Sequence, residues 1–291
     1  MRSQDFISVQ NLSSLIMMLR LPNCIMMASA VLVGYVVMAR RLDLSMNILF
    51  ASLTAMLMTG FANVTNDLAD LNVDLINEPS RPLPSGTVRV STAKIFSVIL
   101  LTFGLVFALL TEKFLNLVLA LIALISATSY NFSLKRTGLL GNAIVSLLVA
   151  LPFLYGAVLY SERLEVTLTI LLMTAFLANL GREVQKGVVD VEGDVARGIR
   201  TIAGRYGAEV ARKLASVFYI SAIFLSPLPF ALGEVSSLYL PPILVADLGF
   251  VKSAVFLLRG GEREKIRREK NLVLLWMALA QIAFITGRYN W

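Results

Sequence analysis

Three aspartates lie close together in the stretch NDLADLNVDLINEPSRPLPSG, which occupies residues 66 to 86. On a helix, spacings of three and four residues would place all three on one face, near two asparagines. The five residues are Asp67, Asp70, Asp74, Asn63 and Asn66. Like charges stacked in this way repel one another, and a divalent cation would relieve the repulsion. Because Mg²⁺ is bound by carboxylates together with substrate phosphates and water, the pattern predicts a site for Mg²⁺ and phosphate.

A second acidic group lies in GREVQKGVVDVEGDVARGIRT, residues 181 to 201. Asp190 and Asp194 are four residues apart, so a helix would again place them on one face. Lys186 lies one turn before Asp190, and Arg182 lies a further turn back. Two facing carboxylate groups would hold a diphosphate through Mg²⁺ ions, of which we expect two, while Lys and Arg bind the remaining oxygens. Solvated helix ends would explain either group alone, but two regular groups favour metal and phosphate.

Other polar residues near the ends of apolar runs are candidates for substrate binding. They are Arg20 and Asn23 in LRLPNC, Arg81 in RPLPSG, and Tyr130, Lys135 and Arg136 in SYNFSLKRTG. The prolines and glycine around Arg81 predict a stiff loop that either holds the arginine or only turns the chain. Arg20 either reaches a phosphate or extends toward the membrane surface. Lys135 and Arg136 are equally well explained as basic residues of a cytoplasmic loop.

The composition indicates that membrane helices position these residues. The 291-residue chain is 57% hydrophobic and 15% charged, whereas a soluble domain has about a quarter charged residues. Nine apolar segments are long enough to span a bilayer, and barrel strands would alternate and be about half as long. We therefore predict an all-α, polytopic membrane protein. The predicted spans are residues 12–39, 46–66, 92–111, 114–133, 139–160, 165–186, 208–232, 235–258 and 270–287.

The distribution of basic residues predicts how the spans are oriented. With a cytoplasmic N-terminus, the inner loops hold most of the Lys and Arg, including the run from Arg259 to Lys270, which we interpret as a solvated linker. Both acidic groups then face the cytoplasm. The net charge of +7 is explained by anionic lipids of the cell membrane and requires no nucleic acid. The chain has no histidine, which excludes His-ligated metals. We expect a single domain over residues 1–291 and no obligate protein partner.

At these residues the chain resembles the UbiA superfamily of intramembrane prenyltransferases over nearly its whole length. Residues 66 to 86 fit the first aspartate motif and the Asn-x-Pro-x-Arg-Pro-x-Pro-Ser-Gly that follows it. YNFSLKRTGLLGN fits the connecting Tyr…Lys motif, and DVEGDVARGIRT fits the second aspartate motif. Within the superfamily, GREVQKGVVDVEGD is most similar to archaeal digeranylgeranylglyceryl phosphate synthases. Those relatives often have Asp and Glu where this chain has Gly187 and Val189.

The resemblance implies nine helices around a central cavity and a Mg²⁺-dependent transfer of a prenyl group from a prenyl diphosphate to a lipid acceptor. In the archaeal synthases the group is geranylgeranyl and the acceptor is geranylgeranylglyceryl phosphate. The expected catalytic residues are Asp67, Asp70, Asp190, Asp194 and Lys186, and the expected metal ligands are Asp67, Asp70, Asp74, Asp190 and Asp194. The expected substrate-binding residues are Arg20, Asn23, Asn63, Asn66, Arg81, Tyr130, Lys135, Arg136 and Arg182.

Three other functions fit part of the pattern. A UbiA-type enzyme with an aromatic quinone, haem or chlorin acceptor would share the motifs. CDP-alcohol phosphotransferases also carry aspartate pairs in membranes, but their Asp-Gly…Ala-Arg…Gly core is absent here. A cation-coupled transporter would place its carboxylates near the bilayer midplane, whereas these aspartates follow the ends of apolar runs.

Without histidine, the base that deprotonates the acceptor is either a carboxylate or the departing diphosphate.

Overall fold

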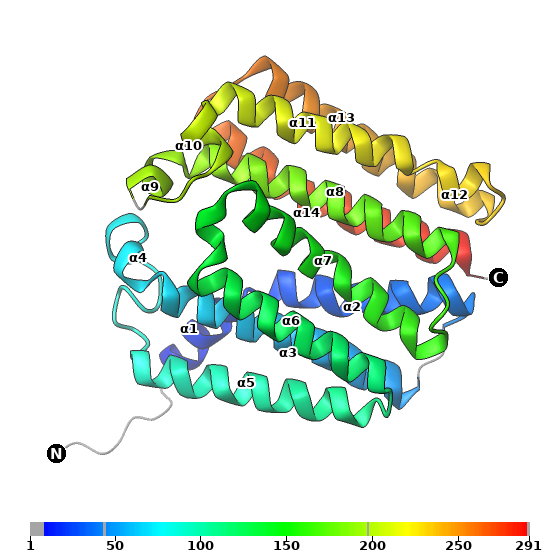
Figure 1. Cartoon of the computed structure of the whole chain (residues 1–291), viewed down its shortest axis with the longest axis horizontal. Coiled ribbons are helices and arrows are strands. Elements are labelled where there is room, and N and C mark those ends of the chain that lie inside the picture. The colour runs from blue at the N-terminus through cyan, green and yellow to red at the C-terminus, as the bar shows by residue number, and fades with distance from the viewer. Residues whose placement is uncertain (1–8, 43–44, 197, 290–291) are drawn as a thin grey trace.

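The computed structural model describes residues 9–42, 45–196 and 198–289, and this part of the chain is a helical bundle without strands (Figure 1). Nine segments of it are long and apolar enough to cross a membrane, which confirms the all-α, polytopic prediction. Each of the first six spans is a single helix: α2 (Leu21–Ala39), α3 (Met46–Ala69), α5 (Val90–Leu110), α6 (Phe114–Phe132), α7 (Leu139–Tyr160) and α8 (Val166–Val189). The last three spans are α11 (Ala208–Leu225) with α12 (Leu228–Ala231), η2 (Ser237–Tyr239) with α13 (Leu240–Arg259), and α14 (Arg263–Arg288).

The predicted first span is wrong as a single helix, because the chain breaks at Arg20. This residue separates α1 (Val9–Leu19) from α2 and has a left-handed backbone, with φ of 55° and ψ of 59°. Pro22 lies in the first turn of α2, where its missing N–H leaves no hydrogen bond unmade. The Leu19 carbonyl, released by the break, accepts a hydrogen bond of 2.8 Å from the Asn63 side chain. The break is therefore built into the structure and directs Arg20 away from the helix axis.

The predicted linker from Arg259 to Lys270 is also wrong. The last helix, α14, begins at Arg263, so most of this basic run is its first turns. Ile266 is buried there, and its carbonyl accepts a hydrogen bond of 3.1 Å from the Gln185 side chain in α8. The N-terminal part of α14 is thus packed against α8 and is not a solvated linker.

Two short helices continue α3 and α8 at the same end of the bundle (Figure 1). The first aspartate arm is residues 66–77, which end in α4 (Leu71–Asn77), and the second is residues 186–196, which end in α9 (Val191–Ala196). Each arm bends at an aspartate with nearly the same backbone angles. These are φ −95° and ψ 3° at Asp70, and φ −100° and ψ 8° at Asp190.

The same two hydrogen bonds bridge the bend in both arms. The N–H of the central aspartate donates to the carbonyl four residues earlier, which belongs to Asn66 in one arm and Lys186 in the other. Its carbonyl accepts from the N–H four residues later, at 2.8 Å from Asp74 and 2.9 Å from Asp194. The two acidic groups of the sequence therefore have the same local geometry.

The middle of the bundle is formed by α2 and α7, which lie between α3, α5 and α6 on one side and α8, α11, α13 and α14 on the other (Figure 1). The two central helices approach to backbone contact at two glycines. A Cβ atom on Gly34 would lie 1.8 Å from the carbonyl oxygen of Phe153, and one on Gly156 would lie 1.9 Å from that of Val31. Small residues permit such close packing between membrane helices, where burial from water supplies no driving force.

At the opposite end from the aspartate arms, Arg288 joins three segments of the chain. Only 1% of its side chain is exposed. It donates to the Val37 carbonyl at 2.7 Å and to the Glu234 carboxylate at 2.7 Å, and it forms an ion pair with Glu165. These contacts tie the end of α14 to α2 and to the loops that precede α8 and η2. A buried arginine with all of its partners in place holds this end of the bundle together.

Candidate active site

A cavity of about 690 Å³ opens between the two aspartate arms and runs into the bundle. Its polar lining lies toward the arms and includes Arg20, Asn23, Asn63, Asn66, Arg81, Tyr130, Arg182, Lys186 and Asp190. The deeper lining is mainly apolar and includes Met26, Met58, Leu119, Ala120, Ala123, Leu148 and Leu151. On α3 the lining extends from Asn66 to Thr54, a length of about 18 Å at the rise of an α-helix. Its shape suits a molecule with a charged head and a long apolar tail.

Ion pairs neutralise the aspartates of the first arm. Arg20 pairs with Asp67 at 2.7 Å and Arg81 pairs with Asp74 at 2.7 Å, and both carboxylates are almost fully buried. Asp70 pairs with Lys135, which comes from η1 (Leu134–Thr137). Each aspartate of this arm thus has one cation from a different part of the chain.

The RPLPSG segment presents Arg81 to the cavity. Pro82 and Leu83 are buried, and the Pro82 carbonyl accepts from the N–H of Val88 at 3.0 Å, which closes the loop. Burial by itself would lower the pKa of Arg81, but the carboxylates of Asp74 and Asp67 outweigh burial and raise the pKa. The guanidinium is therefore firmly charged where it lines the cavity.

The end of α8, where the second arm begins, supplies a separate cationic group around one carboxylate. Glu183 is buried and accepts from Arg182 at 3.2 Å, and Lys186 lies 3.7 Å from its other oxygen. The Lys186 side chain is still 45% accessible, because it faces the cavity. Gln185, on the neighbouring buried face, is fixed between the Tyr219 hydroxyl at 2.6 Å and α14. The helix face that bears Arg182 and Lys186 is therefore held toward the cavity.

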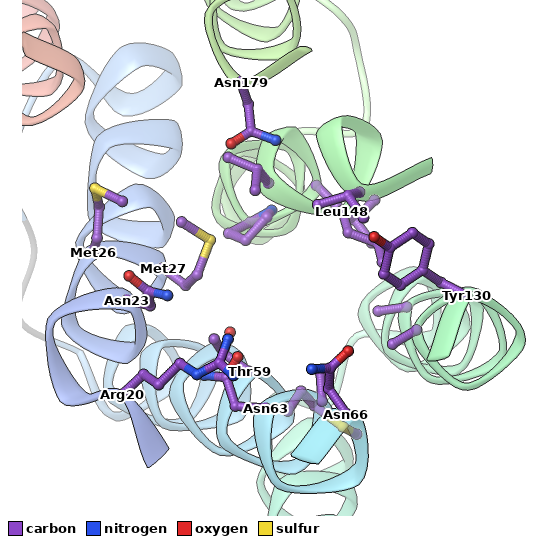
Figure 2. A pocket seen from close by; sticks show the side chains of 18 of the residues that line it. Arg20, Asn23, Met26, Met27, Thr59, Asn63, Asn66, Tyr130, Leu148 and Asn179 are labelled. Atoms are coloured by element: carbon purple, nitrogen blue, oxygen red, sulfur yellow. The ribbon is translucent and has the colours of Figure 1, made fainter. Parts of the chain in front are cut away.

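Amide side chains surround the space between the charged groups. Figure 2 shows Asn23 projecting from α2, Asn66 from α3 and Asn179 from α8 into the space enclosed by the helices. Tyr130, from α6, also lines this space (Figure 2). These neutral groups can accept or donate hydrogen bonds without adding charge to the site.

The structure brings most of the predicted site residues together and separates a few. The predicted residues that do not line the cavity are Asp67, Asp70, Asp74, Asp194, Lys135 and Arg136. The first three and Lys135 lie directly behind the lining, in the ion pairs described above. Arg136 faces a different hollow. Gly187 and Val189, where relatives often have acidic residues, are buried and do not line the cavity.

Several lining residues were not among the predicted ones. Arg267, Lys270, Asn271 and Leu274 of α14 all face the cavity, although Arg267 and Lys270 were assigned to a linker and the other two to the last span without a role. Their spacing of three and four residues is that of one helix face running into an apolar span, and this signal was available in the sequence. Glu183 had a weaker signal, since a buried carboxylate between two cations is recognisable only in three dimensions.

The aspartates fit Mg²⁺ by the chemistry of their oxygens. Among the described residues, no three acidic side chains lie close enough together to hold an ion by themselves, since the first arm is paired with Arg and Lys. Asp190 lines the cavity opposite that arm. Mg²⁺ usually keeps several waters and uses only one or two carboxylates plus substrate phosphates. A site shared between the arms and a bound phosphate is therefore compatible with this donor set.

Residues 27–281 match the model of the UbiA prenyltransferase family. The chain belongs to this family. It is 37% identical over 251 residues to the digeranylgeranylglyceryl phosphate synthase of Methanothermobacter thermautotrophicus. The aligned region covers 85% of this chain and 86% of that protein. The resemblance inferred from the aspartate motifs is confirmed.

Solved structures of the family share the fold. A digeranylgeranylglyceryl phosphate synthase matches with a TM-score of 0.74 and 30% identity over 96% of this chain and 98% of that one. A UbiA homologue from Archaeoglobus fulgidus, bound to geranyl diphosphate and Mg²⁺, matches with a TM-score of 0.66 and 18% identity. The latter match covers 94% of this chain and 99% of that one. UbiA-family members thus include one that binds a prenyl diphosphate together with Mg²⁺.

Proposed function

We propose that this protein transfers a geranylgeranyl group from geranylgeranyl diphosphate to the free hydroxyl of geranylgeranylglyceryl phosphate, which forms the second ether of an archaeal lipid. The similarity to digeranylgeranylglyceryl phosphate synthases along most of the chain supports the substrates. The structural observation that carries the proposal is the cavity with a cationic head and an apolar body between two aspartate arms.

In this proposal the diphosphate binds at the polar end of the cavity. Arg81, Arg182 and Lys186 line that end and carry the positive charge that phosphate oxygens require. Arg20 and Lys135 are adjacent, through their pairs with Asp67 and Asp70. Asn66 and Asn23 orient the head group by hydrogen bonds. As the allylic C–O bond breaks, these cations stabilise the negative charge that develops on the leaving diphosphate.

Bound Mg²⁺ would supply additional positive charge to the leaving diphosphate. The residues that we propose to hold it are Asp67, Asp70, Asp74, Asp190 and Asp194, with two ions shared between the arms. The equivalent bends at Asp70 and Asp190 support this assignment, since they give both arms the same carboxylate presentation. Mg²⁺ in a family member with a prenyl diphosphate supports the choice of metal.

The apolar part of the cavity holds the prenyl tail and keeps water from the reacting carbon. Methionine, leucine and alanine side chains provide most of this lining, and they exclude water, which would otherwise capture the allylic cation. The acceptor hydroxyl then takes the place that water would have. Because the apolar lining excludes water, the prenyl group is transferred to the acceptor and the prenyl diphosphate is not hydrolysed.

We further propose that the whole chain forms one domain in the cell membrane, with the aspartate arms facing the cytoplasm. The family match over residues 27–281 supports a single domain. The Lys and Arg residues that collect in the loops at the end of the arms support the orientation, because such residues are retained on the cytoplasmic side.

Purified protein tests the function directly. With Mg²⁺ and geranylgeranyl diphosphate, we expect geranylgeranylglyceryl phosphate to be alkylated, while a panel of aromatic acceptors is not. Asp190→Asn and Asp67→Asn should reduce turnover by at least about a hundredfold, since each removes charge at the metal site. Asp190→Asn should also shift the Mg²⁺ dependence of turnover to higher concentrations.

The matched control is Glu209→Gln, which removes a carboxylate from an exposed ion pair with Lys213, remote from the cavity lining. It should leave turnover and the Mg²⁺ dependence unchanged. Full activity of both aspartate variants would contradict the metal assignment. Alkylation of an aromatic acceptor in preference to the lipid would contradict the substrate assignment.

A further inference from the structure

A second hollow, of about 670 Å³, lies outside the cavity at the end of the bundle that carries the aspartate arms. Its walls come from η1, the start of α7, the segment after α9, and α10 (Ile202–Tyr206). Arg136, Arg200 and Arg205 line it together with Leu139, Ile202 and Tyr206. We call it the basic pocket.

The three arginines of the basic pocket differ in their partners from Arg20, Arg81 and Arg182 of the cavity. In the cavity and behind it, Arg20, Arg81 and Arg182 each pair with a carboxylate. In the basic pocket no acidic residue contributes to the lining. Within the part of the chain that the structure describes, its guanidinium groups form no ion pair with a carboxylate. Three like charges that share one hollow repel one another, and an anion would relieve that repulsion.

The pocket is held by close backbone packing between its walls. The Arg200 N–H donates to the Arg136 carbonyl at 3.4 Å. Gly138 has a φ of 70°, and a Cβ atom there would lie 2.2 Å from the Arg200 carbonyl oxygen. Arg205 lies over the ring of Tyr206, at 5.2 Å from its centroid. The loop after α9 thus docks on the turn between η1 and α7, which brings arginines from distant parts of the chain to one pocket.

The rim indicates what kind of anion fits. Leu139 and Tyr206 are exposed apolar or aromatic side chains, and Ile202 adds a partly buried one. The pocket lies where α6 and α8 end and α7 begins, which is the level of lipid head groups for spans of this length. In other membrane proteins, basic pockets between helices at this level bind phosphate head groups.

We propose that Arg136, Arg200 and Arg205 form a second binding site, separate from the cavity, for a phosphate group carried by a lipid. The planar guanidinium groups would bind its oxygens in pairs, and the rim would contact the first carbons of the lipid chain. Arg136 directly follows Lys135, which pairs with Asp70 of the first arm. One short segment, η1, therefore contributes to both sites. A lipid phosphate in the basic pocket would lie beside the entrance of the cavity in which we propose the reaction.

Calorimetric titration of the whole protein in neutral detergent tests the site. The probe is dihexanoyl phosphatidic acid, a short lipid phosphomonoester, and dihexanoyl phosphatidylcholine is the zwitterionic comparison. Arg136→Gln, Arg200→Gln and Arg205→Gln should each weaken binding of the phosphomonoester about tenfold, the usual effect of losing one charge-assisted hydrogen bond. Phosphatidylcholine should bind weakly to all proteins.

The matched control is Arg89→Gln, which removes an exposed arginine at the N-terminal end of α5, outside the basic pocket. It should leave the titration unchanged, and an unchanged midpoint of thermal unfolding shows that a variant is folded. Equal binding by wild type and the three pocket variants, or equal binding of the zwitterionic lipid by the wild-type protein, would overturn the proposal. The cations of the cavity are present in every variant, so binding there does not affect the comparison.

Two further measurements distinguish the source of the lipid phosphate. If it belongs to the acceptor, the triple variant should raise the KM for geranylgeranylglyceryl phosphate about tenfold without changing the KM for the donor. If it belongs to a membrane lipid, anionic lipid in nanodiscs should raise the thermal midpoint of the wild type but not of the triple variant. If the triple variant shows neither the change in KM nor the loss of the shift in thermal midpoint, the proposal is overturned. The titration requires no turnover, so a failure of the proposed prenyl transfer would leave its result intact.

Discussion

The depth of the cavity predicts how much of a prenyl chain the protein can hold. Along α6 the lining includes Ala120, Ala123 and Ala127, below Tyr130 at the polar end. At the rise of an α-helix, these alanines lie about 15 Å, 10 Å and 5 Å from Tyr130. A phenylalanine at each position would close the cavity at that depth, because the side chain would project into space that the tail occupies.

Ala120→Phe should affect long donors and spare short ones. If the deepest isoprene unit of the geranylgeranyl tail is excluded, five buried carbon groups at about 0.8 kcal/mol each are lost, which is about 4 kcal/mol. The kcat/KM for geranylgeranyl diphosphate should then fall about a thousandfold, while that for geranyl diphosphate should change little. Ala123→Phe should lower the ratio of the two values further, and Ala127→Phe should reduce turnover of both donors.

The assay is the ratio of kcat/KM for the two donors with one acceptor, because the ratio cancels differences in the amount of active protein. Leu121→Phe is the matched control, since it enlarges an exposed side chain of the same helix that does not line the cavity. An unchanged ratio in Ala120→Phe would refute the assignment of the deep cavity to the prenyl tail. So would a ratio that falls in Leu121→Phe to the same extent.

Three further predictions concern the fold. Gly34→Ala should prevent stable packing of α2 on α7, because its Cβ would lie 1.8 Å from a backbone oxygen. Gly104→Ala should be tolerated, because a Cβ there would make an ordinary contact of 3.5 Å. The yield of monodisperse protein and the thermal midpoint measure the effect of both variants. Arg288→Met should lower the free energy of unfolding by about 3 kcal/mol, the lower end for a broken buried ion pair since both carboxylates are partly exposed, as measured by denaturation in detergent. The hydrogen bond from Arg288 lowers the pKa of Glu234, so the stability from this pair should be complete above the ordinary pKa of about 4.3 and disappear as the pH falls through the lower folded value. Glu234→Gln should flatten the decline of the thermal midpoint between pH 5 and pH 3, roughly the range in which a glutamate titrates.

The elements and the chemistry of the site were predictable because both depend on local pattern. Hydropathy alone located the spans, and the predicted 139–160 coincides with α7. The spacing of the aspartates predicted shared faces, and the structure keeps the helical hydrogen bonds through the bends at Asp70 and Asp190. A run of apolar residues and a repeat of three and four residues can both be read without knowledge of the fold.

Two of the three ion pairs of the first arm could not be predicted, because their partners are far apart in the sequence. Arg20 and Asp67 are separated by 47 residues, and Lys135 and Asp70 by 65 residues. Only the packing of α1, α3 and η1 brings each pair together. The break at Arg20 had a signal in Pro22, which favours the first turn of a helix, but the continuous apolar run on both sides obscured it.

The ion pairs at the mouth of the cavity affect the order in which ligands bind. In the proposed reaction, a Mg²⁺ ion that arrived alone would have to displace Arg20, Lys135 or Arg81 from its carboxylate and leave that cation without a counter-charge. The diphosphate supplies the missing counter-charge, so each ligand should strengthen the binding of the other, with the same coupling free energy in both directions. Without substrate the mouth is internally neutralised and should have little affinity for free Mg²⁺. On the proposed mechanism, the protein would therefore select the metal and the diphosphate together.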